Sequence, residues 1–166
     1  MAGKSQAGFD AYVKEHALTP FFLHPVMGDK ILCIVCGDCG GHRLTGILAE
    51  LNYTCNQRTF ELVGCMAGAG MPVSLDDPTT QSFILREFER WHQVKPGVMT
   101  VVLATHSDCG MENLRDHDIK QHIADLRRGR DFLAGNILDC DGNPIRVITA
   151  IKGDGDGNNR LFVIPD

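Results

Sequence analysis

The chain has 166 residues, of which 43% are hydrophobic and 22% charged, and its formal net charge is -5. This length and composition predict a single globular domain over residues 1–166 that can bury a core. The negative charge excludes a basic surface for nucleic acid or an anionic membrane, and no apolar run approaches the roughly 20 residues that cross a bilayer. The first residues, MAGKSQAGFD, include no apolar stretch typical of a signal peptide, so we expect a cytoplasmic location.

Seven cysteines are many for a chain of this length. Their odd number, without a signal-like segment, favours reduced thiols over a disulfide framework. Some of these thiols are expected to bind a metal and others to pack in the core. We expect plain packing roles for four of them: Cys33, Cys55, Cys65 and Cys140.

The first elements in chain order are a helix and a strand. Residues 5–16 predict a short helix, and Pro20 and Pro25 make the rest of the N-terminal arm, residues 1–29, irregular. The run KILCIVC, residues 30–36, is continuously apolar and of strand length. Such a run is typical of a strand that is buried on both faces of a parallel sheet.

Helices and strands then alternate. Amphipathic stripes predict helices over residues 44–51 and from Pro78 to about Pro96, and a strand is expected over residues 59–65. The helical stripes consist of Leu44, Ile47, Leu48 and Leu51 in the first helix, and of Ile84, Phe88 and Trp91 in the second.

The second half of the chain continues this alternation. Residues 98–105, VMTVVLAT, form another apolar strand, and Ile119, Ile123 and Leu126 mark a helix. Two more strands are expected over residues 145–151 and 160–164. The predicted fold class is therefore α/β, with a mainly parallel central sheet flanked by helices. The last two strands are separated by a short turn and are expected to be antiparallel.

Two of the predicted strands end in loops that carry thiols. In parallel sheets, functional sites gather beyond the carboxyl ends of the strands. If the strands over 30–36 and 98–105 are neighbours, Cys36 lies at the same edge as His106 and Cys109. Two thiolates and an imidazole form a ligand set that suits Zn2+. The fourth position would then hold water, substrate or a carboxylate such as Asp38.

Other interpretations of these residues stay open. Cys33, Cys36 and Cys39 could belong to an iron–sulfur or redox site, although Cys33 lies within the apolar strand. Cys39 and His42 could also be metal ligands. The glycine-rich segment MAGAG, residues 66–70, is expected to pass close to the metal pocket. The remaining histidines are expected at the surface or on helices: His16, His24, His92, His117 and His122.

The two thiol-bearing loops resemble those of the β-class carbonic anhydrases. That family carries C-x-D-x-R after one strand and H-x-x-C, usually as H-S/T-D-C-G, after a later one. Here Cys36-Gly37-Asp38 and HSDCGM, residues 106–111, match these motifs, and AGAG stands near the place of an R-N-A-G-like segment. The resemblance extends from about Lys30 to the end of the chain.

This resemblance implies a β-carbonic anhydrase-like domain in which Cys36, His106 and Cys109 bind Zn2+. It also implies a homodimer or a higher homo-oligomer with the active site near the subunit interface. A zinc-bound hydroxide would attack CO2 to give bicarbonate, and Asp38 would be the catalytic residue that orients the water. The expected partner is thus a small-molecule substrate, CO2 or bicarbonate or an analogue, with no nucleic acid and no membrane.

The chain departs from the family at the arginine that pairs with the aspartate. Gly40 stands in its place, so Asp38 could itself become a fourth metal ligand and close the open position. The R-N-A-G arginine is absent as well, and Arg43 or Arg58 could supply a cation instead. Two alternatives follow from this difference. The protein could hydrolyse a CO2-like small molecule, or it could be a non-catalytic zinc protein.

Overall fold

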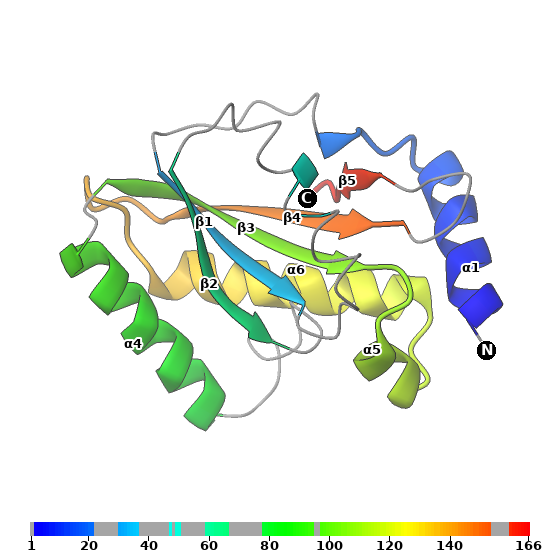
Figure 1. The fold of residues 1–166 in the computed structure, drawn as a ribbon, viewed down its shortest axis with the longest axis horizontal. Helices are drawn as coiled ribbons and strands as arrows, with labels where there is room; N and C mark the ends of the chain where they lie inside the picture. The colour runs from blue at the N-terminus through cyan, green and yellow to red at the C-terminus, as the bar shows by residue number, and fades with distance from the viewer. Residues whose placement is uncertain are drawn as a thin grey trace.

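The computed structural model describes residues 2–21, 30–36, 47, 49–50, 59–66, 78–94, 97–153 and 160–166. Figure 1 shows the elements formed by these residues. They are α1 (Ala2–Glu15), β1 (Lys30–Cys36), β2 (Thr59–Met66), α4 (Pro78–Val94), β3 (Val98–His106), α5 (Gly110–Leu114), α6 (Ile119–Asn136), β4 (Arg146–Lys152) and β5 (Leu161–Val163).

Within the described residues, five strands form one sheet in the order β2-β1-β3-β4-β5. β1 is parallel to both β2 and β3, and β3 is parallel to β4. β5 is antiparallel to β4. The predicted α/β class, a mainly parallel sheet with an antiparallel C-terminal pair, is confirmed.

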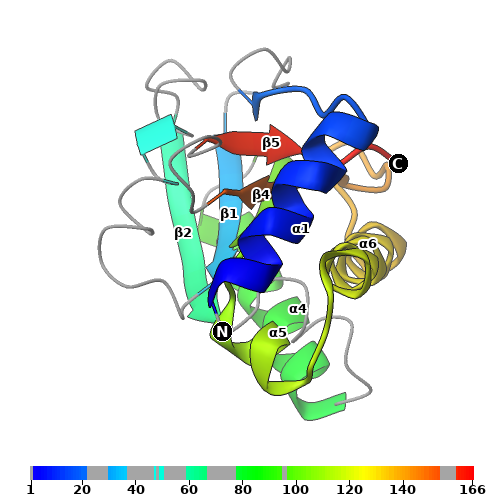
Figure 2. The ribbon, with the colours of Figure 1, turned by 90° about the vertical axis from the view of Figure 1, so that its right-hand side faces the viewer.

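Four strands, β1, β3, β4 and β5, bury side chains on both faces of the sheet, because successive residues point in opposite directions. On the face that packs against α1, α4 and α6, Leu32 and Ile34 of β1 lie with Leu103 of β3; we call it the α6 face. Figure 2 shows α4 and α6 on the same side of the sheet. On the opposite face, the Ile47 face, Cys33 lies with Ile47. Burial on both faces explains why the run from residue 30 to 36 is almost entirely apolar.

The helices bury the apolar stripes that the sequence predicts. Ile84 and Phe88 of α4 are buried, as are Ile123 and Leu126 of α6. The N-terminal helix begins earlier than predicted, at Ala2, and contributes Phe9 and Tyr12 to the core, where the Phe9 and Phe162 rings meet edge to face. The predicted helix over 44–51 lies largely outside the described residues, although Ile47 is helical and fully buried.

The packing roles of the cysteines are confirmed in one case and wrong in another. Cys33 is fully buried among the side chains of the Ile47 face. Cys140, in contrast, is exposed. It lies in a tight turn where Asp139 Oδ1 accepts hydrogen bonds from the backbone N–H groups of Asp141 and Asn143, each at 2.9 Å, so its side chain has no core to enter. Cys55 and the side chain of Cys65 lie outside the described part of the chain.

None of the described helices is both long and apolar enough to cross a bilayer.

Candidate functional site

The carboxyl ends of β1 and β3 lie side by side. Val35 pairs with Ala104 in the parallel register, so Cys36, the last residue of β1, is level with Thr105. His106 is the next residue and ends β3. The backbones of two predicted ligand positions, Cys36 and His106, therefore reach the same edge of the sheet, while the side chain of Cys36 is outside what the structure describes.

His106 is fully buried at this edge. Its register partner on the neighbouring strand β4 is Lys152, and the N–H of Ser107 donates a 2.8 Å hydrogen bond to the Lys152 carbonyl. Ala104, two residues earlier on β3, belongs to the Ile47 face. Because strand side chains alternate between faces, the His106 side chain leaves the strand on that same face.

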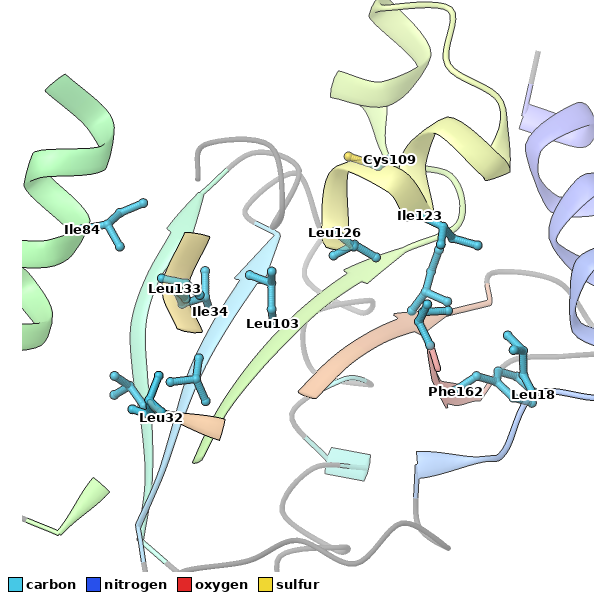
Figure 3. Packing of buried hydrophobic residues seen from close by; sticks show 14 of the residues in the cluster. Leu18, Leu32, Ile34, Ile84, Leu103, Cys109, Ile123, Leu126, Leu133 and Phe162 are labelled. Carbon is cyan, nitrogen blue, oxygen red and sulfur yellow. The ribbon is translucent and has the colours of Figure 1, made fainter. Parts of the chain in front are cut away.

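Cys109 is also fully buried, three residues after the end of β3. It occupies the N-cap position of α5, but its side chain does not cap the helix. Cys109 packs with the cluster of the α6 face. Figure 3 shows it on the same side of the sheet as Ile123 and Leu126 of α6. His106 and Cys109 thus start from opposite faces of the sheet, and an ion bound by both would lie between these faces, beyond the end of β3.

A partly buried ion pair also lies at this edge. Lys152 Nζ is 2.9 Å from Glu50 Oε1, and Glu50 Oε2 accepts a 2.7 Å hydrogen bond from the backbone N–H of Leu161. The Lys152 side chain is only 6% exposed, so the Glu50 carboxylate supplies a neighbouring negative charge that a buried ammonium needs. The pair joins the helical residue Glu50 to the ends of β4 and β5.

The rest of the predicted site lies outside the described residues. This holds for the fourth-ligand candidate, for the further ligand candidates, for the position of the missing arginine, for the two substitute arginines and for most of the glycine-rich loop. These residues are Asp38, Cys39, Gly40, His42, Arg43, Arg58 and residues 67–70.

A second group of polar side chains comes from α5, α6 and the turn between them. Glu112 lies on α5, His117 follows the turn and Asp125 lies on α6. One ligand atom of each residue lies within 4.8 Å of the ligand atoms of the other two. This buried group could hold a metal ion.

The chain between α5 and α6 is built to bring His117 back against α5. Asp116 has φ +54°, a left-handed conformation that aspartate tolerates better than most residues. The N–H of His117 then donates a 3.0 Å hydrogen bond to the Glu112 carbonyl. Directly afterwards, Asp118 and Gln121 exchange side-chain to backbone hydrogen bonds of 2.9 and 2.8 Å, a capping box that fixes where α6 begins.

The charges in this group are closely coupled. His117 Nδ1 lies 2.8 Å from Glu112 Oε2 and 3.4 Å from Asp125 Oδ2, and Arg115 Nη1 lies 2.9 Å from the same Asp125 oxygen. Burial raises the pKa of Glu112 above its ordinary value, because a carboxylate loses its hydration, and the charge of Asp125 raises it further. The hydrogen bond from His117 and the charges of His117 and Arg115 oppose this rise.

The sequence-based expectation for His117 was wrong. We expected a surface or helix position, whereas the side chain is 19% exposed, lies outside a helix and contacts two carboxylates. His122 is on a helix as expected, but it is buried and its Nε2 lies 3.2 Å from Thr105 Oγ1. One signal was available: Asp125 directly precedes Leu126 and borders the apolar stripe of α6, where a buried carboxylate needs partners.

Comparison of the chain with protein-family models, with curated proteins and with solved structures gives no significant match.

Proposed function

We propose that this protein is a zinc-dependent lyase of the β-carbonic anhydrase type that hydrates CO2 reversibly to bicarbonate. The observation that carries the proposal is the parallel pairing of β1 with β3. Adjacent strands lie about 4.8 Å apart, so Cys36 and His106 are close enough to share one metal ion. A strand between them would double this separation and count against a common ion.

The donor chemistry supports the same proposal. Two cysteine thiolates and one histidine nitrogen are a ligand set that zinc prefers and that leaves a fourth position for water. His106 and Cys109 are both fully buried, and a water-poor surrounding strengthens charge interactions around a metal. Zinc held by these residues would lower the pKa of a bound water towards 7 and so supply a nucleophile for CO2 at neutral pH.

The chain's own residues have separate roles in this proposal. Cys36, His106 and Cys109 hold the metal, and β1, β3 and the start of α5 fix their backbones. Asp38 accepts a hydrogen bond from the reacting water and orients it towards CO2. The Lys152–Glu50 pair beside His106 ties β4 and β5 to this edge and so supports the position of the β3 terminus.

Metal analysis and CO2 hydration assays on the purified protein test the proposal. We expect one tightly bound zinc per chain and hydration that increases from about pH 7 to about pH 9, as a zinc-bound water ionises. Cys109→Ser should lose the zinc and lower hydration by at least about 100-fold. Cys140→Ser is the matched control, because Cys140 is exposed, and should change neither.

A zinc-loaded protein that does not hydrate CO2 over this pH range would contradict the lyase proposal. The glycine at position 40 then favours changed chemistry, which hydrolysis of a carbon–sulfur analogue of CO2 would reveal. A non-catalytic site closed by Asp38 would instead show four protein ligands by X-ray absorption spectroscopy. Asp38→Asn would then open a position for water.

We also propose that the protein is a homodimer or a higher homo-oligomer, located in the cytoplasm. The resemblance to the β-class carbonic anhydrases supports the assembly, and the odd number of cysteines, which favours reduced thiols, supports the location. Sedimentation analysis of the zinc-loaded protein should give at least twice the mass of one chain. A monomer at all concentrations would contradict this part of the proposal.

A further inference from the structure

A second metal site is carried by residues outside the proposed zinc-lyase ligand set. We propose that Glu112, His117 and Asp125 bind a divalent cation such as Zn2+ through one imidazole nitrogen and two carboxylate oxygens. Their ligand atoms lie within 4.8 Å of one another and come from α5, the following turn and α6. Histidine nitrogen and carboxylate oxygen are both ligands of zinc in proteins.

The group is a built site and not an exposed cluster of acids. The side chains of Glu112 and Asp125 are 3% and 6% exposed, and that of His117 is 19% exposed. Backbone contacts hold the three residues together: the His117 N–H donates to the Glu112 carbonyl, and the capping box of Asp118 fixes the start of α6. The donors are therefore positioned before any ion arrives, which lowers the entropy cost of binding.

An unsatisfied carboxylate oxygen is the second and independent observation. Glu112 Oε1 is buried and has no hydrogen-bond partner, whereas Oε2 of the same carboxylate contacts His117. A buried carboxylate oxygen without a partner is costly, and such groups usually bind water, a proton or an ion. Oε1 and Oε2 belong to one carboxylate, so an ion bound through both oxygens would satisfy Oε1.

The charge balance leaves room for one more cation. Arg115 at 2.9 Å compensates the charge of Asp125, while Arg128 reaches the other Asp125 oxygen only at 3.5 Å from an exposed position. With His117 neutral, the charge of Glu112 is left. A divalent cation bound by the two carboxylates would offset this charge. A metal ion at Nδ1 needs the lone pair of that nitrogen, so neutral His117 would bind it as the tautomer whose proton is on Nε2.

Titration of the metal-stripped, full-length protein with Co2+ tests the proposal, because the two sites differ in their ligands. Cobalt bound by cysteine thiolates shows intense charge-transfer absorption, and cobalt bound by nitrogen and oxygen shows only weak ligand-field bands. We expect a second equivalent of Co2+ without the thiolate signal, displaced by Zn2+. The second equivalent of Co2+ should still bind to Cys109→Ser, in which a ligand of the thiolate site is removed. The second metal site can therefore be confirmed even if the zinc-lyase proposal fails.

Substitutions of the proposed ligands test whether these residues bind the second equivalent of Co2+. Glu112→Gln keeps the side-chain size and should raise the dissociation constant for that equivalent at least about tenfold, as should His117→Ala. Glu89→Gln, at an exposed position of α4, is the matched control and should leave it unchanged. Circular dichroism checks that each variant is folded.

If Glu112→Gln or His117→Ala does not fold, a measurement on a protein that keeps all three proposed ligands still tests the site. X-ray absorption of zinc-loaded Cys109→Ser should show imidazole nitrogen and carboxylate oxygen around the metal. The proposal is overturned if the protein takes up no thiolate-free equivalent of metal, or if Glu112→Gln and His117→Ala bind that equivalent as tightly as the unmodified protein.

Discussion

The imidazole of His122 on α6 contacts the hydroxyl of Thr105 on β3, with Nε2 and Oγ1 3.2 Å apart and both residues buried. Thr105 immediately precedes His106, so this contact ties α6 to the strand end that carries a proposed zinc ligand. We expect Thr105→Val, which keeps the shape of the side chain, to lower the free energy of unfolding by about 1–3 kcal/mol, because it removes a partner of a buried imidazole. Urea denaturation measures the change.

Thr19→Val is the control for this variant. Thr19 is exposed, and its backbone carbonyl, not its side chain, accepts a hydrogen bond from Val163. The substitution should change the unfolding free energy by less than about 0.5 kcal/mol. Equal effects of the two substitutions would show that the Thr105–His122 contact adds nothing to stability.

Removing one charge of the Lys152–Glu50 pair should lower the free energy of unfolding more than removing both, because the remaining charge is then buried without its partner. Glu50→Gln keeps an acceptor for the Leu161 N–H but removes the negative charge 2.9 Å from the nearly buried Lys152 ammonium. We expect a loss of about 2 kcal/mol in the free energy of unfolding, below the usual cost of breaking a fully buried pair, because Glu50 is 26% exposed.

A double variant separates these contributions. Lys152→Met in the Glu50→Gln background removes the remaining charge, and we expect it to recover part of the lost stability. Chemical denaturation of the single and double variants gives the coupling free energy. A coupling near zero would mean that the two side chains are neighbours without a stabilising interaction.

The capping box at the start of α6 should be worth about 1 kcal/mol. Asp118→Ala removes the carboxylate that accepts from the Gln121 N–H, whereas Asp118→Asn keeps an oxygen acceptor and serves as the control. We expect a loss of about 1 kcal/mol for alanine and a small change for asparagine, measured by thermal unfolding. Because the box also fixes the position of His117, the alanine variant should weaken the proposed second metal site as well. Equal stability of the two variants would contradict a role for the cap.

The sequence predicted elements well where one physical effect dominates. The strand over residues 30–36 was predicted with its observed bounds, because burial on both faces requires an apolar residue at nearly every position. The loop that was expected after the 98–105 strand contains the start of the short helix α5, whose five residues are too few to show an apolar stripe.

Strand neighbours are harder to predict than strands. The sequence order places the 59–66 strand between β1 and β3 along the chain, but in the sheet β1 lies directly beside β3. The prediction that Cys36 and His106 lie at the same edge of the sheet therefore required β1 and β3 to be neighbours. Only the fold shows that they are. The second group escaped prediction because Glu112, His117 and Asp125 have no motif spacing, and the left-handed turn at Asp116 brings them together.

The raised pKa of Glu112 makes a pH-dependent prediction for the metal-free protein. Burial disfavours the charged carboxylate in the folded state, so its pKa lies above the ordinary value of 4.5 that applies in the unfolded chain. The folded state then holds the proton more tightly than the unfolded state. The associated stability is fully present below about pH 4.5 and is lost as the pH rises through the folded-state pKa.

Glu112→Gln isolates this effect, because glutamine does not titrate while the other carboxylates do so in both proteins. We expect the free energy of unfolding of Glu112→Gln, relative to the unmodified protein, to increase from pH 4 towards neutral pH when a chelator is present. Denaturation curves at a series of pH values measure the difference. A difference that falls with pH would mean that the His117 and Arg115 charges outweigh burial and that the Glu112 carboxylate is stabilised in its charged form.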